Sequence, residues 1–358
     1  MSARACIIPV FVPHLGCPHA CVFCNQRRIT GQLRPADAQT VRRVIEQAAA
    51  LPPNGAERQL AFYGGSFTAI PAEQQEELLQ AAHDALERGK IDSIRLSTRP
   101  DAVNEQVLAR LRRFGVETVE LGAQSMDDEV LRLSGRGHTA EDVARASEQI
   151  KAAGFKLILQ MMTGLPGDTL DRCVETAKRI IRLQPDGVRI YPTVIVKDTR
   201  LYDLWRQGKY REHTVQDAVS VCARLLPLFE KAGIPVIRLG LNPTEELSGG
   251  AAVAGAYHPA LGELVKSRIL LNRARELLAG VLPGSCVVLG IGARRLSQLI
   301  GQKRENAESL RRDFALSELK FVPLEDRDAA LSLLGVERGP IAPEREQVPS
   351  GKAPLPLD

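Results

Sequence analysis

Between residue 5 and about residue 240, short β-rich runs alternate with longer stretches in which apolar residues recur at helical spacing. This alternation is typical of repeated βα units, which pack helices over a parallel sheet. The expected strands cover residues 6–12, 59–63, 91–97, 117–122, 155–161, 187–191 and 235–239. The expected helices cover residues 37–50, 71–88, 103–114, 139–153, 168–182 and 214–232. About six such units predict an α/β fold of the partial (β/α)6-barrel type.

Segments rich in glycine, proline and polar residues follow the expected strands. They are the cysteine-containing loop from residue 17 and residues 63–68, 97–101, 122–125, 163–167 and 191–193. Turn formation explains any one of these segments taken alone. In barrels of parallel strands, however, the working groups stand at the carboxyl ends of the strands. Six such segments at the same end therefore predict a functional site there.

Three cysteines lie within eight residues, at Cys17, Cys21 and Cys24. Thiolates at this spacing on a tight loop can each bind a different iron of a [4Fe-4S] cluster, and the fourth iron then lacks a protein ligand. The alternative is a zinc site completed by His14 or His19, although structural zinc usually takes two closely spaced ligand pairs and the sequence has no second pair. We therefore predict a cluster whose open iron binds S-adenosylmethionine (SAM).

Taken together, these motifs resemble those of the radical SAM superfamily, and within it the radical SAM domain of the Elongator catalytic subunit, an enzyme of tRNA wobble-uridine modification. The resemblance extends more loosely to oxygen-independent coproporphyrinogen III oxidase. The matching motifs occur in the same order from residue 17 to about residue 220. They are the cysteine loop and residues 62–68, 98–101, 120–125, 136–139, 164–167 and 190–193.

The resemblance also implies site residues. Cys17, Cys21 and Cys24 would bind iron, and Tyr191 is a candidate substrate contact. The expected SAM contacts are Phe23, Gly64, Gly65, Ser66, Arg99, Gln124, Arg136 and Gln160. The paired glycines would let the backbone approach the amino group of SAM. Ser66 and Gln160 occupy positions at which related enzymes often carry acidic residues.

The remaining sequence predicts a lid and connecting helix over 241–283, a small basic module over 284–337 and a disordered tail over 338–358, after a barrel over 1–240. The module has βααβ order and is KH-like. Between Arg294 and Asp313 it has six basic and three acidic residues, an excess of 6 − 3 = +3. We predict that Lys303 and Arg304, in the loop between its helices, bind RNA. Arg304 replaces the second glycine of the Gly-x-x-Gly loop, and a solvated helix pair is the alternative explanation of the charge.

The predicted function is that of a radical SAM enzyme that uses a 5′-deoxyadenosyl radical to abstract hydrogen from RNA, with tRNA as the substrate. The net charge of +4 permits an RNA partner. We expect an electron donor such as flavodoxin or ferredoxin, a cytoplasmic location and no DNA partner. We also expect no membrane partner, because no apolar run approaches membrane-spanning length.

Two alternatives to this function are kept. One is a radical SAM enzyme with a small-molecule or tetrapyrrole substrate, and the other is a non-catalytic iron–sulfur or zinc protein that binds RNA. The 358 residues are too few to include the acetyltransferase domain of the Elongator subunit, so acetyl-CoA chemistry is not expected.

Overall fold

The structure, a computed structural model, describes residues 5–12, 17, 19–25, 36–50, 55–241 and 247–338. The chain divides into two compact units, residues 1–265 and 266–358. Part of the predicted lid, residues 242–246, and the predicted tail from residue 339 onward lie outside the described residues. None of the described helices combines the length and the apolar character that a transmembrane span requires.

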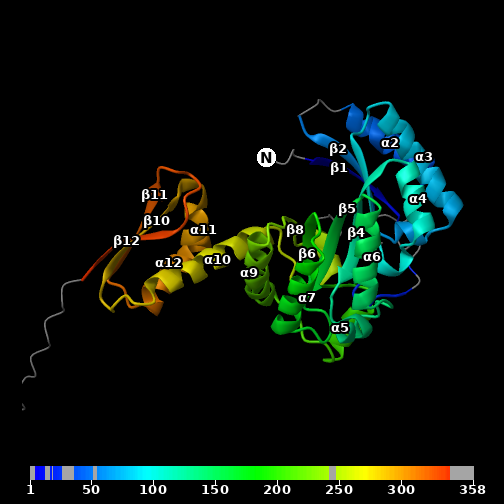
Figure 1. The fold of residues 1–358 in the computed structure, drawn as a ribbon. Helices are drawn as coiled ribbons and strands as arrows, with labels where there is room; N and C mark the ends of the chain where they lie inside the picture. Colours follow the sequence, from blue (N-terminus) through cyan, green and yellow to red (C-terminus); the bar gives the residue numbers. More distant parts are fainter. Residues whose placement is uncertain are drawn as a thin grey trace, which may run out of the picture. The chain divides into compact units, whose positions relative to one another are not determined.

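The first unit is built on a sheet of seven strands that are all parallel and follow one another in chain order (Figure 1). The strands are β1 (Ala5–Phe11), β2 (Glu57–Tyr63), β3 (Ser93–Thr98), β4 (Val116–Gln124), β5 (Lys156–Thr163), β6 (Gly187–Pro192) and β8 (Val236–Leu239). The first and last strands are not paired with each other, so the sheet is an open half-barrel. The predicted fold class is confirmed.

Six long helices accompany these strands and cover the outer face of the curved sheet (Figure 1). They are α2 (Ala38–Ala49), α3 (Ala72–Glu87), α4 (Glu105–Arg113), α6 (Ala140–Ala152), α7 (Leu170–Arg182) and α9 (Val215–Lys231). Polar side chains fix where they begin: Thr139 and Thr214 each form a capping box at the start of α6 and α9. Fully buried Leu60, Leu96 and Leu121 hold the sheet against this layer.

Several short elements were not expected from the sequence. They are β7 (Val194–Val196), β9 (Ala252–Gly255), α5 (Asp128–Leu133), α8 (Arg200–Arg206) and the single turns Phe67–Ala69, Pro100–Ala102, Leu247–Ala251, Ala293–Arg295 and Gln302–Arg304. β7 and β9 pair antiparallel, although β9 lies within residues 241–283, for which a lid and a connecting helix are predicted. Elements this short show no periodicity, and contacts between distant segments stabilise them.

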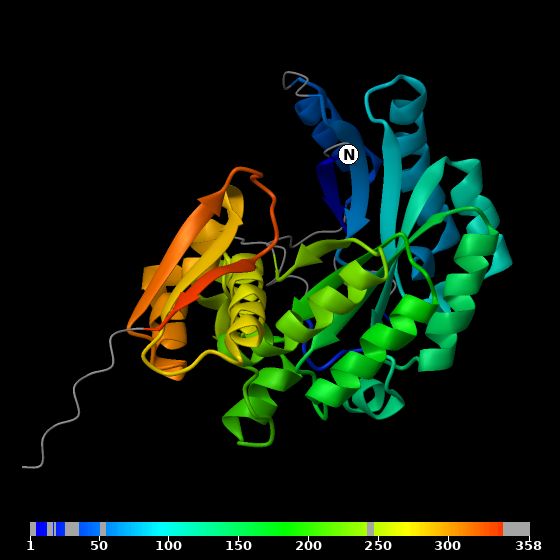
Figure 2. The same ribbon diagram turned by 60° about the vertical axis from the view of Figure 1, so that its left-hand side comes forward.

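The second unit contains a three-stranded sheet with helices on one face (Figure 2). Its elements are the end of α10 (Leu261–Leu278), then β10 (Cys286–Gly292), α11 (Leu296–Ile300), α12 (Glu305–Asp313), β11 (Glu318–Leu324) and β12 (Ser332–Glu337). β10 lies in the centre, parallel to β11 and antiparallel to β12. The order β10-α11-α12-β11 is the predicted βααβ order, β12 was not expected, and the KH-like assignment stays a prediction.

Candidate functional site

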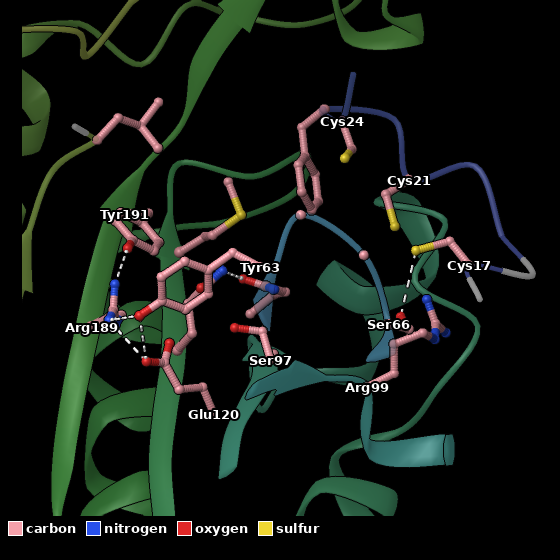
Figure 3. A pocket seen from close by; sticks show the side chains of 18 of the residues that line it. Cys17, Cys21, Cys24, Tyr63, Ser66, Ser97, Arg99, Glu120, Arg189 and Tyr191 are labelled. Carbon is pink, nitrogen blue, oxygen red and sulfur yellow. Dashed lines mark hydrogen bonds and ion pairs between the residues drawn. The ribbon is translucent and has the colours of Figure 1, made fainter. Parts of the chain in front are cut away.

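The carboxyl ends of the half-barrel strands surround a cavity of about 760 Å³ (Figure 3). Every residue predicted to contact iron or SAM lines this cavity, and so does Tyr191. These residues are Cys17, Cys21, Phe23, Cys24, Gly64, Gly65, Ser66, Arg99, Gln124, Arg136, Gln160 and Tyr191. Lys303 and Arg304 belong to the second unit. The structure thus brings the predicted cofactor residues together, and their individual roles stay predictions.

The cysteine loop lies along one side of the cavity, and its three sulfur atoms lie on that same side (Figure 3). The backbone N–H of Cys24 donates to the carbonyl of Cys21 at 3.1 Å, which folds the loop tightly. The sulfur of Cys17 is 3.4 Å from the Ser66 hydroxyl, and the sulfur of Cys21 accepts from Nη1 of Arg136 at 3.3 Å. Two of the three thiols therefore already contact other predicted site residues.

The loop is held in place by elements that lie far from it in the sequence. The N–H of Val22 donates to the carbonyl of Ser134 at 3.0 Å, and the carbonyl of Val22 accepts from the N–H of Leu201 at 2.7 Å. The Val22 side chain is buried with Ile195, Leu201 and Tyr210. The short helices α5 and α8, which the sequence did not reveal, thus supply the anchors of the cysteine loop.

Two glycines allow the segment after α5 to approach the cysteine loop. Gly135 and Gly137 both have left-handed backbone conformations, with φ of 65° and 72°. A Cβ atom at residue 137 would lie 2.2 Å from Nε2 of His19. The backbone angle favours glycine at position 137, and a Cβ there would force the exposed His19 ring to move.

Arg136, between these two glycines, joins the cysteine loop to the sheet. Its Nη2 donates to the carbonyl of Gly122 at 2.8 Å, while its buried Nε has no hydrogen-bond partner among the described residues. Arg99 supports this segment, because its Nη2 donates to the carbonyl of Arg136. The Arg99 guanidinium also forms two bonds with Asp101, at 2.8 and 3.1 Å. Arg99 therefore lines the cavity with most of its donors already engaged by protein.

Gln124, the last residue of β4, faces Gln160, which lies three residues before the end of β5. Nε2 of Gln160 donates to Oε1 of Gln124 at 3.2 Å. The register of β4 against β5 shifts between Gly122 and Gln124, and Gln124 has a φ of 66°. This bulge places the Gln124 side chain on the cavity wall.

A cluster of buried charged residues, none of which is among the predicted site residues, lies on the side of the cavity opposite the cysteines (Figure 3). One oxygen of Glu120, Oε1, accepts from Arg95 at 2.8 Å, from Arg189 at 2.8 Å and from the Tyr63 hydroxyl at 3.0 Å. Arg189 also donates to the hydroxyls of Tyr63 and Tyr191, at 2.8 and 3.1 Å. Burial, followed by the negative charge of Glu120, raises the pKa of Tyr63 to about 12.

The sequence did carry a signal for this cluster. Arg95, Glu120 and Arg189 each stand between two apolar residues in the middle of a predicted strand. Strands of a parallel sheet are buried on both faces and usually read as continuous apolar runs. A charged residue within such a run has to face either a partner or a cavity, and here the three residues meet one another.

The donor set fits an iron–sulfur cluster with SAM. Among the described residues, no three His, Cys, Asp or Glu side chains are placed to hold a single metal ion. A cubane cluster makes a different demand, because each thiolate binds its own iron. The cavity offers three thiols on one side, the positive-φ backbone of Gly64 at 91°, and the guanidinium of Arg136. These are a soft ligand set, a close backbone approach and a donor for an anionic group.

The sequence is similar to known families and proteins. The sequence matches the radical SAM superfamily over residues 11–180 and the radical SAM C-terminal domain over residues 185–270. It is 32% identical to human Elongator complex protein 3 over 226 residues, which cover 58% of this chain and 40% of that protein. It is 27% identical over 227 residues to the tRNA uridine(34) acetyltransferase of Methanocaldococcus infernus, covering 58% and 42%. The match thus spans less than half the length of these relatives.

The fold resembles that of a solved structure, archaeal Methanocaldococcus infernus Elp3 with an N-terminal deletion. The TM-score is 0.59 at 23% sequence identity, and the match covers 81% of this chain and 71% of that one. This similarity supports the half-barrel fold.

We expect Gly137→Ala to loosen the cysteine loop, because the new Cβ would displace His19. Reaction of the loop thiols with a thiol reagent should become several-fold faster in the unmetallated protein. Gly154→Ala is the matched control, because Gly154 has a similar φ of 83° and nothing lies within 4 Å of its Cβ position. Equal thiol reactivity in both variants would contradict the role given to the His19 contact.

The free energy of unfolding should depend on pH through His138. This residue directly follows Gly137, in the segment that contacts the cysteine loop. Burial, followed by the positive charge of Arg136, lowers the pKa of His138 to about 4. The unfolded chain takes up this proton below about pH 6.5 while the folded protein stays neutral, so stability is lost as the pH falls. Denaturant unfolding of the wild type should lose about 2 kcal/mol more than His138→Asn between about pH 8 and pH 5. Identical pH profiles would contradict this assignment.

Proposed function

Because this chain belongs to the radical SAM superfamily of enzymes, whose members use a [4Fe-4S] cluster and SAM, we propose that it modifies RNA by radical chemistry, with tRNA as its substrate. The observation that carries the radical chemistry is the cavity itself, which collects all the residues predicted to bind iron and SAM. We further expect reduction by flavodoxin or ferredoxin and a cytoplasmic location.

When bound, the cluster and SAM together supply a 5′-deoxyadenosyl radical for hydrogen abstraction. The residues of this chain hold the components and exclude water. Cys17, Cys21 and Cys24 would bind three irons, and the Gly64-Gly65 backbone would accommodate the amino group of SAM. Arg136 would act at the carboxylate of SAM through its guanidinium, because this residue lines the cavity.

The RNA part of the proposal is supported by the names of the relatives, one of which is a tRNA uridine acetyltransferase. A second support comes from the loop between α11 and α12. Lys303 and Arg304 are exposed there and make no ion pair with any of the described residues. Their positive side chains are available for phosphate groups.

The backbone of this loop also matters for RNA binding. Gly301, Lys303 and Arg304 all have positive φ, at 80°, 50° and 67°. Arg304 stands where the KH loop has its second glycine, and it adopts the conformation that favours glycine. The glycine-like turn is therefore kept, and a cation is added to it.

We expect Cys21→Ala to prevent cluster assembly, since it removes one of the three thiolates. After anaerobic reconstitution with iron and sulfide, the variant should lack cluster absorbance and should form no 5′-deoxyadenosine when reductant and SAM are added. Cys286→Ala is the control, because Cys286 lies in the second unit, and it should behave like the wild type. Cluster absorbance that persists in Cys21→Ala would refute the ligand assignment.

Binding to total tRNA should weaken when Lys303 and Arg304 are both replaced by alanine. The dissociation constant should rise about tenfold, and its salt dependence should become shallower because fewer counterions are released. Arg294→Ala is the control, since Arg294 is also exposed and basic but pairs with Asp328 at 3.2 Å. Wild-type binding that is absent or insensitive to salt would argue against RNA as the substrate.

A further inference from the structure

The charged cluster opposite the cysteines is not electrically balanced. Arg95 and Arg189 each form an ion pair at 2.8 Å, and both pairs end on the same carboxylate, that of Glu120. Glu120 is 3% exposed, and each arginine side chain is 12% exposed. Two guanidinium groups and one carboxylate leave one positive charge in excess. Tyr63 does not offset it, since its raised pKa of about 12 keeps the phenol neutral.

The described residues supply no second carboxylate on this side. Glu120 is the only acidic residue among those that line the cavity, whereas Arg99, Arg136 and Arg189 all do so. Asp101 pairs with Arg99, and Arg136 lies against the cysteine loop. The excess charge at Arg189 is therefore separate from the charges that surround the predicted cofactor residues. Holding it in a confined cavity is unfavourable unless water or an anion solvates it.

Donors on this side remain available to a ligand. Arg189 lines the cavity, and its Nη1 carries a second N–H besides the one that donates to the Tyr191 hydroxyl. The Tyr191 hydroxyl accepts from Nη1 of Arg189, and no described residue takes its proton. A guanidinium next to a phenol O–H can bind the oxygens of an anion with two or more charge-assisted hydrogen bonds.

We propose that Arg189 and Tyr191 form an anchoring site for an anionic group of the substrate, a phosphate or a carboxylate, on the side of the cavity facing the cysteines. This inference deepens the proposed function and rests on the cavity being its reaction chamber. Tyr191, predicted as a substrate contact, becomes a donor to that anion. Glu120 is a positioning residue that fixes the Arg189 guanidinium and limits the excess charge to one.

Equilibrium binding to the reconstituted protein tests the site with two matched pairs of probes. The affinity for uridine 5′-monophosphate compared with that for uridine shows whether the site recognises a phosphate. The affinity for orotate compared with that for uracil shows whether it recognises a carboxylate. The wild type should bind the anionic member of at least one pair about tenfold more tightly than the neutral member, as charge-assisted hydrogen bonds require. The pair that shows the difference identifies the source of the anion.

The Arg189→Gln variant should lose this preference and bind both members of the pair alike. Arg189→Lys keeps the positive charge but lacks the planar guanidinium with its paired N–H donors, so it should retain part of the preference for the anionic probe. Arg110→Gln is the matched control, because Arg110, on helix α4, pairs with Glu76 on helix α3 and does not line the cavity.

The Glu120→Gln variant separates this proposal from a merely structural ion pair. Removing the carboxylate raises the excess charge, so the anionic probe should bind at least about threefold more tightly. A cluster that only stabilises the fold would give weaker or unchanged binding in this variant.

Two results would overturn the proposal. One is a wild type that prefers neither anionic probe over its neutral partner. The other is an Arg189→Gln variant that loses SAM binding, because Arg189 would then belong to the cofactor. A failure of the proposed function can be told apart from a failure of the anion site. The proposed function is tested by 5′-deoxyadenosine formation and by tRNA binding, and neither measurement uses these probes.

Discussion

The contact between the cysteine loop and the segment after α5 determines what the rest of the site can do. Gly137 leaves room for His19, and Arg136 reaches both the sulfur of Cys21 and the carbonyl of Gly122. The loop, the end of β4 and the guanidinium are thus fixed relative to one another. Three thiols on a free loop would be reactive but unplaced, and this packing sets them at the mouth of the half-barrel.

The cavity that results has two different sides. The cysteine side offers soft sulfur ligands and backbone groups, while the opposite side offers a confined guanidinium and two phenols. Buried charges of this kind rarely add to stability, because desolvation offsets their attraction. Their presence in the interior of a half-barrel is therefore better explained by a ligand than by folding.

Much of this organisation was predictable from the sequence. Alternating strand and helix patterns predicted the seven parallel strands and the six helices over them, because long elements carry their own periodicity. The motifs after the strands predicted the residues around the cavity, because parallel strands end at the same edge. The short elements α5, α8, β7 and β9 escaped prediction, and two of them hold the cysteine loop. Their stability comes from contacts between segments far apart in the chain.

The half-barrel, the three thiols and the family of the chain could be read from the residues alone, since each follows from local spacing or from motifs in a fixed order. In contrast, Arg95 and Arg189, 94 residues apart by number, come to share the single carboxylate of Glu120 only in the folded chain. Charge balance in a cavity depends on which strands are neighbours and which side chains face inward. That pairing is set when the strands assemble into the curved sheet, and no local sequence pattern specifies it.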